Sequence, residues 1–291
     1  MKDKRIEIIQ VHKINSGKIT ETADKVAVEE PLQIQLEYST ATGQILKDIA
    51  VTMRTPGNDE ELAAGFLFTE GIIKSADAIS EIKHAHTDAN LVQVILKENI
   101  IPAMGNAARN FYTTSSCGIC GKASIDAIET VSKYREVKNI SLIPAAVFYT
   151  LQNELEKQQK VFEDTGGIHA SALFDVDGKF MMLREDVGRH NALDKIIGAA
   201  MLNNQLPLNN CILLLSGRAS FELVQKAVMA GIKIIASVGA PSSLAVEMAT
   251  ENDVTLIGFL KEDRFNIYSG RERIDASPQP SPEGEGARAH G

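Results

Sequence analysis

The fold is decided by residues 211–260, which read CILLLSGRASFELVQKAVMAGIKIIASVGAPSSLAVEMATENDVTLIGFL. Three short apolar runs begin at Cys211, Ile232 and Val254, and two stretches with helical spacing of apolar residues separate them. Apolar runs this short and this continuous are typical of strands that are buried on both faces. The alternation therefore predicts parallel strands that are joined by helices and right-handed crossovers.

The residues before this stretch extend the same pattern. Pro144 fits the first turn of a helix, and the turn sequence Asp175-Val176-Asp177-Gly178 lies between two apolar segments, as in a β-hairpin. Another helix is expected over residues 191–202. This order of elements predicts an α/β fold whose C-terminal domain, residues 144–275, is a three-layer α/β/α structure.

The sequence pattern of residues 1–143 predicts a smaller, β-rich α+β domain. The first fifty-five residues alternate apolar and polar positions around a Thr42-Gly43 turn, as in a hairpin or meander. A helix is expected after Asn58, whose side chain would cap the free amides, and Gly71 would end it. A further strand is expected over residues 90–96.

The last residues, 276–291, have a composition unlike the rest of the chain. They read ASPQPSPEGEGARAHG and contain no aliphatic residue larger than alanine. Such a segment buries too little apolar surface to offset the entropy of ordering it. We therefore expect a disordered tail.

Composition excludes several classes of protein. The chain has 291 residues, with 30 Lys and Arg against 38 Asp and Glu, which gives a net charge of −8. A net negative charge disfavours sequence-independent binding to nucleic acid. No apolar run has the length of a membrane span. Three cysteines are too few for a disulfide framework. The expectation is a soluble, cytoplasmic protein.

Two of the cysteines form the motif Cys117-Gly118-Ile119-Cys120, just before a helix expected over residues 122–134. The spacing alone allows a disulfide, a metal site or a nucleophilic thiolate. Zinc would need two further Cys or His ligands, and the remaining thiol, Cys211, starts an apolar strand. A thioredoxin-like site has even less support than a zinc site. A Gly- and Ser-rich loop precedes the motif, whereas a thioredoxin-like motif lies between a strand and a helix. The helix N-terminus and Lys122 favour a thiolate, which could carry sulfur.

The three predicted parallel strands end in unusual loops. Their segments are Ser216-Gly217-Arg218, Gly239-Ala240-Pro241 and Phe259 to Arg264. Each loop by itself is an ordinary connection between a strand and a helix. Ligands of open α/β sheets bind outside the carboxyl ends of the strands, and glycines, helix N-termini and cations suit anions. Together, the loops favour a phosphate-bearing or otherwise anionic ligand.

Polar residues also gather at His169 and in the segment REDVGRHN, residues 184–191. His169 is either a structural histidine with an internal partner or part of a site. In the second segment, Asp186 or Asn191 could cap a helix while Arg189 pairs with a carboxylate. The segment is otherwise a candidate for ligand binding.

Several long motifs resemble one known family. They read RTPGNDEELAAGFLFTEGII, SSCGICGKASID, GGIHASALFD, REDVGRHNALDKIIG, LLLSGRASFELVQKA and IIASVGAPSSLAVEMA. In this order, from about Val26 to Ile274, they resemble the formate dehydrogenase accessory sulfurtransferases of the FdhD/NarQ family. Members of that family are sulfur carriers. They take persulfide sulfur from a cysteine desulfurase and deliver it to the molybdenum or tungsten bis-guanine-dinucleotide cofactor before it enters formate dehydrogenase.

The resemblance implies roles for individual residues. Cys117 corresponds to the cysteine that bears the persulfide, and Cys120 corresponds to its partner. The cofactor's nucleotide part would lie at Phe259, Leu260, Lys261, Glu262, Asp263 and Arg264, with Ser216, Gly217, Arg218 and Gly239 nearby. No resident metal is implied, and the resemblance suggests a homodimer.

The family fold is similar to that of cytidine deaminases, but deaminase chemistry does not fit this sequence. Zinc deaminases need the motif H-x-E followed later by P-C-x-x-C. Here His169-Ala170-Ser171 lacks the glutamate, and the CxxC motif comes before the histidine. A second hypothesis is a cofactor-binding chaperone for formate dehydrogenase that does no chemistry at sulfur.

Overall fold

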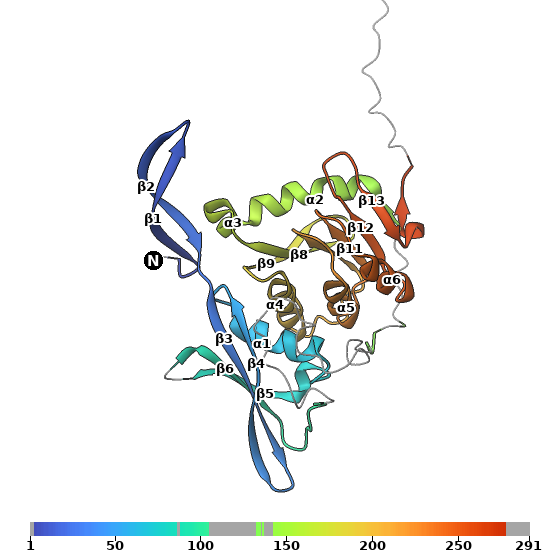
Figure 1. The fold of residues 1–291 in the computed structure, drawn as a ribbon. Coiled ribbons are helices and arrows are strands. Elements are labelled where there is room, and N and C mark those ends of the chain that lie inside the picture. Colours follow the sequence, from blue (N-terminus) through green and yellow to red (C-terminus); the bar gives the residue numbers. More distant parts are fainter. Residues whose placement is uncertain (1–2, 86–87, 105–131, 135, 137–141, 278–291) are drawn as a thin grey trace, which may run out of the picture.

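A computed structural model describes residues 3–85, 88–104, 132–134, 136 and 142–277 of the chain (Figure 1). The CxxC motif, most of the helix expected after it and nearly all of the expected tail lie outside these residues. The described part contains a large central sheet, a smaller N-terminal sheet and a separate two-stranded ribbon.

The central sheet has six strands in the order β13-β12-β11-β10-β8-β9. Their bounds are β8 His169–Asp175, β9 Phe180–Asp186, β10 Cys211–Leu215, β11 Ile234–Ser237, β12 Thr255–Gly258 and β13 Asn266–Ser269. The three central strands β10, β11 and β12 are parallel, whereas β8, β9 and β13 pair antiparallel. The predictions of parallel strands and of the hairpin at residues 175–178 are confirmed. Strand β13 was not predicted.

Helices cover both faces of this sheet (Figure 1). Helices α2 (Ala145–Gln158) and α3 (Lys160–Thr165) lie on one face, and α4 (Arg189–Leu202), α5 (Phe221–Met229) and α6 (Ser243–Glu251) lie on the other. Alternate residues of β10 pack against the helices on opposite faces of the sheet. Leu214 packs in the cluster under α2, and Leu213 packs in the cluster under α4 and α5. The three-layer arrangement is confirmed, and its cytidine-deaminase-like type stays a prediction.

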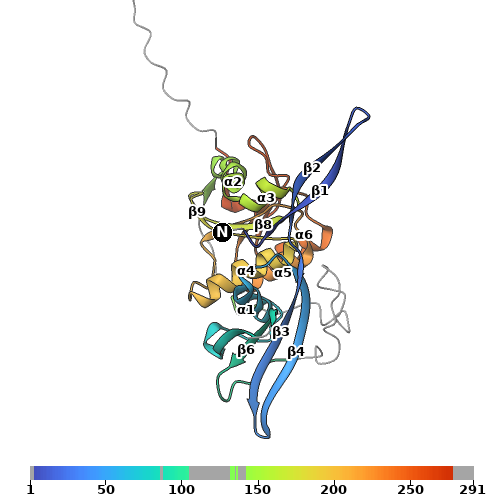
Figure 2. The ribbon, with the colours of Figure 1, turned by 90° about the vertical axis from the view of Figure 1, so that its left-hand side faces the viewer.

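The N-terminal part is a four-stranded sheet with one helix and a projecting ribbon. The sheet order is β4-β3-β6-β5. The bounds are β3 Glu30–Thr40, β4 Gly43–Arg54, β5 Ile79–Ala85, β6 Asp88–Leu96 and α1 Asp59–Thr69. The ribbon consists of β1 (Ile6–Asn15) and β2 (Lys18–Ala27), and it extends away from the body in both views (Figures 1 and 2). Short strands β7 (Ile143–Pro144) and β14 (Ile274–Asp275) pair with each other.

The predicted cap of α1 is wrong. Asn58 has a left-handed backbone with φ of 57°, and its side chain makes no capping hydrogen bond. An N-cap side chain reaches the free amides from an extended backbone conformation, which Asn58 does not adopt. The first turn is held instead by Asp59, whose carboxylate accepts two hydrogen bonds of 2.9 Å from the guanidinium of Arg54.

Helices α1 and α4 join the N-terminal part to the α/β/α layers (Figure 2). They cross at Gly65 and Gly198, where backbones meet so closely that a Cβ on Gly198 would lie 1.8 Å from the carbonyl oxygen of Glu61. Beside the crossing, Nζ of Lys226 lies 2.9 Å from a carboxylate oxygen of Asp194, and both side chains are buried. One continuous apolar cluster therefore spans both parts.

Candidate functional site

The three strand-end loops meet at one edge of the central sheet. The amide of Gly239 donates to the carbonyl of Gly217 at 3.0 Å, and the amide of Phe259 donates to the carbonyl of Gly239 at 3.1 Å. Gly239 allows this approach, because a Cβ there would lie 3.0 Å from the amide nitrogen of Arg218. The structure thus brings together the segments that the sequence singled out for ligand binding.

The third loop, residues 259–264, presents most of its side chains to solvent. Phe259 has a left-handed φ of 53° and is 46% exposed, an unusual conformation for a bulky residue and one that tends to occur at functional sites. The amide of Lys261 donates to the carbonyl of Arg264 and closes a turn. Lys261, Glu262, Asp263 and Arg264 are exposed. Leu260 differs, because its side chain is fully buried in the core.

Three arginines at this edge have no partner among the residues that the structure describes. Arg189, Arg218 and Arg264 make no side-chain hydrogen bond or ion pair with any residue that the structure describes. The other described arginines all do, and these are Arg5, Arg54, Arg184, Arg271 and Arg273. Arg189 starts α4, just after the end of β9, and Arg218 follows β10. Cations left unpaired together at a strand-end edge are suited to an anionic ligand.

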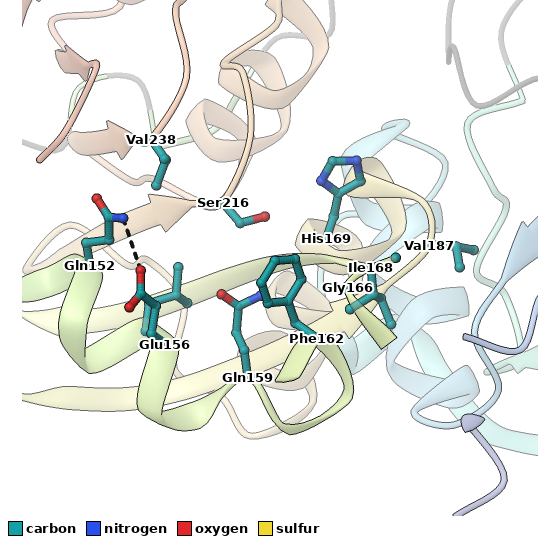
Figure 3. Close-up of a pocket in the computed structure, with 12 residues that line it drawn as sticks. Gln152, Glu156, Gln159, Phe162, Gly166, Ile168, His169, Val187, Ser216 and Val238 are labelled. Atoms are coloured by element: carbon teal, nitrogen blue, oxygen red, sulfur yellow. Dashed lines mark hydrogen bonds between the residues drawn. The ribbon is translucent and has the colours of Figure 1, made fainter. Parts of the chain in front are cut away.

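A pocket of about 470 Å³ opens at the same edge, between the α2–α3 corner and the strand ends (Figure 3). It is lined by Gln152, Leu155, Glu156, Gln159, Phe162, Gly166, Gly167, Ile168, His169, Val187, Ser216 and Val238. Among the residues expected at a site, Ser216, His169 and Val187 of the segment 184–191 lie in this wall. Ser216 Oγ accepts a hydrogen bond from the amide of Ala170 at 2.8 Å, so its own proton is free for another acceptor.

His169 is a half-buried pocket residue. Its ring lies beside Gly217, and it makes no hydrogen bond with the described residues. Burial lowers the pKa of His169, and the positive charge of Arg189 and the neighbouring His190 lower it further. The imidazole is therefore neutral at neutral pH and offers one donor and one acceptor. The alternative of an internally paired histidine has no support among the described contacts.

Some residues of the REDVGRHN segment, residues 184–191, hold the fold together, and others are available to a ligand. Asp186 is fully buried, lies 2.7 Å from Nζ of Lys195 and accepts a hydrogen bond from the amide of Thr55. It therefore links the N-terminal part to the sheet edge. The N-cap of α4 is Gly188 rather than Asp186 or Asn191, and Arg189 pairs with none of the described carboxylates.

Sequence reasoning missed the part of the pocket that α2 and α3 contribute. Gln152, Glu156, Gln159 and Phe162 lie more than fifty residues before the first strand-end loop. Polar residues on an amphipathic helix usually face solvent, so the sequence carried no signal for them. Only the packing of α2 and α3 over the sheet brings them to the edge.

The predicted persulfide pair, Cys117 and Cys120, lies outside the described residues. The third cysteine, Cys211, has the core role that its apolar strand predicted, because it is 7% exposed at the start of β10. Burial raises the pKa of the Cys211 thiol to about 11, and the nearby charge of Asp175 contributes. This thiol is protonated at neutral pH and is unsuited to nucleophilic chemistry.

Among the described helices, none combines the length and the apolar content that a membrane span needs.

Comparisons with known proteins agree with these observations. The model of the FdhD/NarQ family matches residues 27–275. The chain is 46% identical to a protein of Mycolicibacterium paratuberculosis named sulfur carrier protein FdhD, over 91% of this chain and 97% of that protein. A protein of the same name from Streptomyces avermitilis is 45% identical, over 91% of this chain and 94% of the relative.

A solved structure has the same overall fold. It is the crystal structure of a protein from Desulfotalea psychrophila, described provisionally as a formate dehydrogenase accessory protein. The TM-score is 0.68 at 26% sequence identity, and the match covers 92% of this chain and 99% of the other. The resemblance carried by the six sequence motifs is thereby confirmed. The chain belongs to the FdhD/NarQ family.

Proposed function

We propose that this protein is a sulfur carrier that serves formate dehydrogenase. Cys117 takes persulfide sulfur from a cysteine desulfurase, and the protein passes this sulfur to a molybdenum or tungsten bis-guanine-dinucleotide cofactor. The names of the relatives support the carrier role, and the motif SSCGICGK supplies a thiol at the matching position. The cofactor is the substrate of this transfer.

The accepting step is ordinary thiolate chemistry. The Cys117 thiolate attacks the outer sulfur of the desulfurase persulfide, and a new sulfur–sulfur bond forms at Cys117. The sulfur–sulfur bond of the donor breaks, and the desulfurase cysteine leaves as a thiolate. The electrons balance within this exchange, so sulfur moves between the two proteins without an added oxidant or reductant.

The observation that carries the cofactor part of the proposal is the ring of unpaired cations around the strand-end edge. Arg189, Arg218 and Arg264 have no described partner, and Lys261 lies in the same loop as Arg264. The phosphates of a dinucleotide are the kind of anion that such a cluster binds. Gly217 and Gly239 let a ligand approach the backbone, and Leu260 would contribute main-chain atoms only.

The sulfur carrier role is tested by intact-mass measurement after incubation with a cysteine desulfurase and cysteine. Wild type should gain the mass of one sulfur atom, which dithiothreitol removes. Cys117→Ala should gain none and should fail to restore formate dehydrogenase activity in cells that lack this protein. Cys211→Ala is the matched control and should still accept sulfur, because its thiol is buried.

The same measurement distinguishes the second hypothesis. A cofactor-binding chaperone without sulfur chemistry would gain no removable sulfur, and Cys117→Ala would keep full activity in cells. Either result would contradict the carrier role while leaving cofactor binding intact.

We propose the cytoplasm as the site of action, because a reducing compartment keeps the CxxC thiols available. We also propose a homodimer, in line with the family resemblance. The ribbon β1–β2 supports a protein contact of this kind, since Ile14 and Ile19 pair across its tip and are 66% and 62% exposed. Light scattering of the purified protein would measure the mass of the assembly.

A further inference from the structure

The ribbon β1–β2 is fixed at its base and exposed along most of its length (Figures 1 and 2). At the base, Nη1 of Arg5 lies 3.8 Å from a carboxylate oxygen of Glu185, and Lys25 pairs with Asp164 of α3. Within its two strands, the partly buried residues are Ile6, Val11, Val26 and Ala27. A hairpin of only two strands is marginally stable in water, and further strands stabilise it. The ribbon is therefore a structure that a partner can complete.

The register of the ribbon shows which backbone groups of β1 are unused. The amide of Val28 donates to the carbonyl of Arg5 at 2.8 Å, in line with the register that pairs Asn15 with Lys18. Bonding toward one neighbour alternates along an antiparallel strand, so the odd-numbered residues of β1 bond to β2. Among the described strands, β1 pairs only with β2. The backbone groups that point to the open edge belong to Ile8, Gln10, His12 and Ile14.

The composition of β1 favours pairing along this open edge. The strand reads IEIIQVHKIN, so five of its ten residues are isoleucine or valine and none is proline. An exposed edge of this kind is a template for a strand of another chain. Glu7 and Lys13 are exposed, and neither side chain forms a hydrogen bond or an ion pair with any residue that the structure describes. These two charges can therefore select the partner.

Strand β1 is complementary to a second copy of itself. When two copies run antiparallel with Gln10 opposite Gln10, Glu7 of each copy lies opposite Lys13 of the other. The remaining opposed pairs are Ile6 with Ile14, Ile8 with His12, and Ile9 with Val11. Opposite charges and β-branched residues that lie directly across antiparallel strands stabilise the pair. The information for pairing is thus contained in one strand.

The neighbouring registers lack this complementarity. Outward backbone groups of two copies meet only when the twofold axis passes through a residue. With the axis at Ile9, Lys13 would lie opposite Arg5, and like charges in opposed positions are destabilising. With the axis at Val11, Lys13 would lie opposite Ile9 and would form no ion pair. Of these three registers, the one at Gln10 is the only one that pairs both charges.

We propose that two copies of this protein join through the open edges of their β1 strands, antiparallel and centred on Gln10, to form one four-stranded sheet. The isoleucines at the tip of the ribbon, Ile14 and Ile19, then lie in one row with Ile6 of the second copy. This inference rests on the proposed function in one respect, since it names the surface that forms the homodimer. It does not depend on the sulfur chemistry.

Charge reversal tests the register. Sedimentation equilibrium of the full-length protein should show a dimer for wild type. Lys13→Glu and Glu7→Lys should each weaken dimerisation about tenfold, because both ion pairs of the dimer become contacts between like charges. Circular dichroism should show normal folding, since both side chains are exposed.

Restoring the opposite charges should restore the dimer. A chain with both Glu7→Lys and Lys13→Glu should dimerise as wild type does. An equimolar mixture of the two single variants should also dimerise, because the two lysines of one chain face the two carboxylates of the other. Single variants that are monomeric and are rescued in neither way would overturn the register.

Proline substitution tests the edge itself. Gln10→Pro removes an amide that points to the open edge, and proline is tolerated in an edge strand at such a position. The ribbon should remain while the dimer is lost. Ala23→Pro is the matched control, because Ala23 pairs with Gln10 across the ribbon and its amide points to the other edge, that of β2. This variant should stay dimeric, and the reverse result would place the contact on β2 and overturn the inference.

Failure of this inference is separate from failure of the carrier role. Ribbon variants that dimerise as wild type does would overturn the inference and leave a homodimer through another surface. A monomeric wild type would contradict both the homodimer and its proposed surface. Sulfur acceptance at Cys117 is measured by intact mass on the same preparations and tests the carrier role alone. Dimeric ribbon variants that accept sulfur more slowly than wild type would assign the ribbon to the desulfurase instead.

Discussion

At the scale of single residues, the environment of a side chain decides its chemistry more than its identity does. Cys211 is a thiol, but its burial at the start of β10 raises its pKa and keeps it protonated at neutral pH. Asp186 and Arg189 lie three positions apart, but Asp186 is held by Lys195 whereas Arg189 has no described partner. Predictions for individual residues follow from these environments.

We expect Cys211 to resist alkylation in the native protein. Burial raises its pKa from 9.0 to about 11, so the reactive thiolate is roughly hundredfold less abundant at about pH 8 than in a free thiol. Iodoacetamide labelling followed by peptide mass spectrometry measures the rate with and without denaturant. Native labelling of Cys211 as fast as in denaturant would contradict the buried position.

His169 should make the protein less stable in mild acid. Burial lowers its pKa below 6.5 in the folded state, whereas the unfolded chain keeps the ordinary value. As pH falls through that value, the unfolded state binds a proton that the folded state does not, and the free energy of unfolding decreases. Denaturant midpoints at about pH 7.5 and pH 5.5 measure this loss. The loss should be smaller in His169→Gln, and an equal loss in both proteins would refute the assignment.

At the scale of elements, close helix packing sets the geometry on which the site depends. Helices α1 and α4 touch through Gly65 and Gly198, and α4 carries Arg189 at its start. The contact places the N-terminal sheet against the α/β/α layers. Alternating apolar residues in β10 fill both cores, which holds the sheet between its helices.

Gly198→Ala should destabilise the protein strongly. In an ordinary helix interior this change is stabilising by about 1 kcal/mol. Here the new Cβ would lie 1.8 Å from the carbonyl oxygen of Glu61, so we expect a loss of about 3 kcal/mol or more in the free energy of unfolding. Urea unfolding measures it.

Gly167→Ala serves as the control, because its Cβ would meet only the carbonyl oxygen of Thr165, at 3.8 Å. Its stability should stay within about 0.5 kcal/mol of wild type. Similar effects of the two changes would show that the helices can separate at little cost.

At the scale of the whole molecule, charge is distributed unevenly despite the net charge of −8. Among the described arginines, those without a partner all lie at the strand-end edge. Elsewhere the arginines bond to carboxylates or to backbone oxygen. An acidic protein therefore keeps a local site for an anion.

Arg264→Ala should weaken the binding of guanosine diphosphate by about three- to tenfold, because an exposed arginine contributes about 1 kcal/mol to an ionic contact. Lys179→Ala is the control, since Lys179 lies in the hairpin turn at the opposite end of the strands. Calorimetry at two salt concentrations should show a smaller salt dependence for Arg264→Ala than for wild type. Equal losses in the two variants would indicate diffuse attraction, and no binding by wild type would show that the strand-end site is misplaced.

The sequence by itself determined the family and most elements of the α/β/α layers, with β13 and α3 as exceptions. The runs at Cys211, Ile232 and Val254 predicted β10, β11 and β12, because the length and continuity of an apolar run are local properties that specify a buried strand. The CxxC motif and the strand-end glycines also identified candidate chemistry from local spacing alone.

The tertiary structure decided which residues share a site. Gln159 and Glu156 reach the strand ends only because α2 and α3 pack across the sheet, and nothing local distinguishes them from other polar residues on a helix. The cap predicted at Asn58 failed for a related reason, since the Arg54–Asp59 contact holds that turn instead. Pairings between residues distant in sequence depend on the packing of the whole chain, so local patterns do not reveal them.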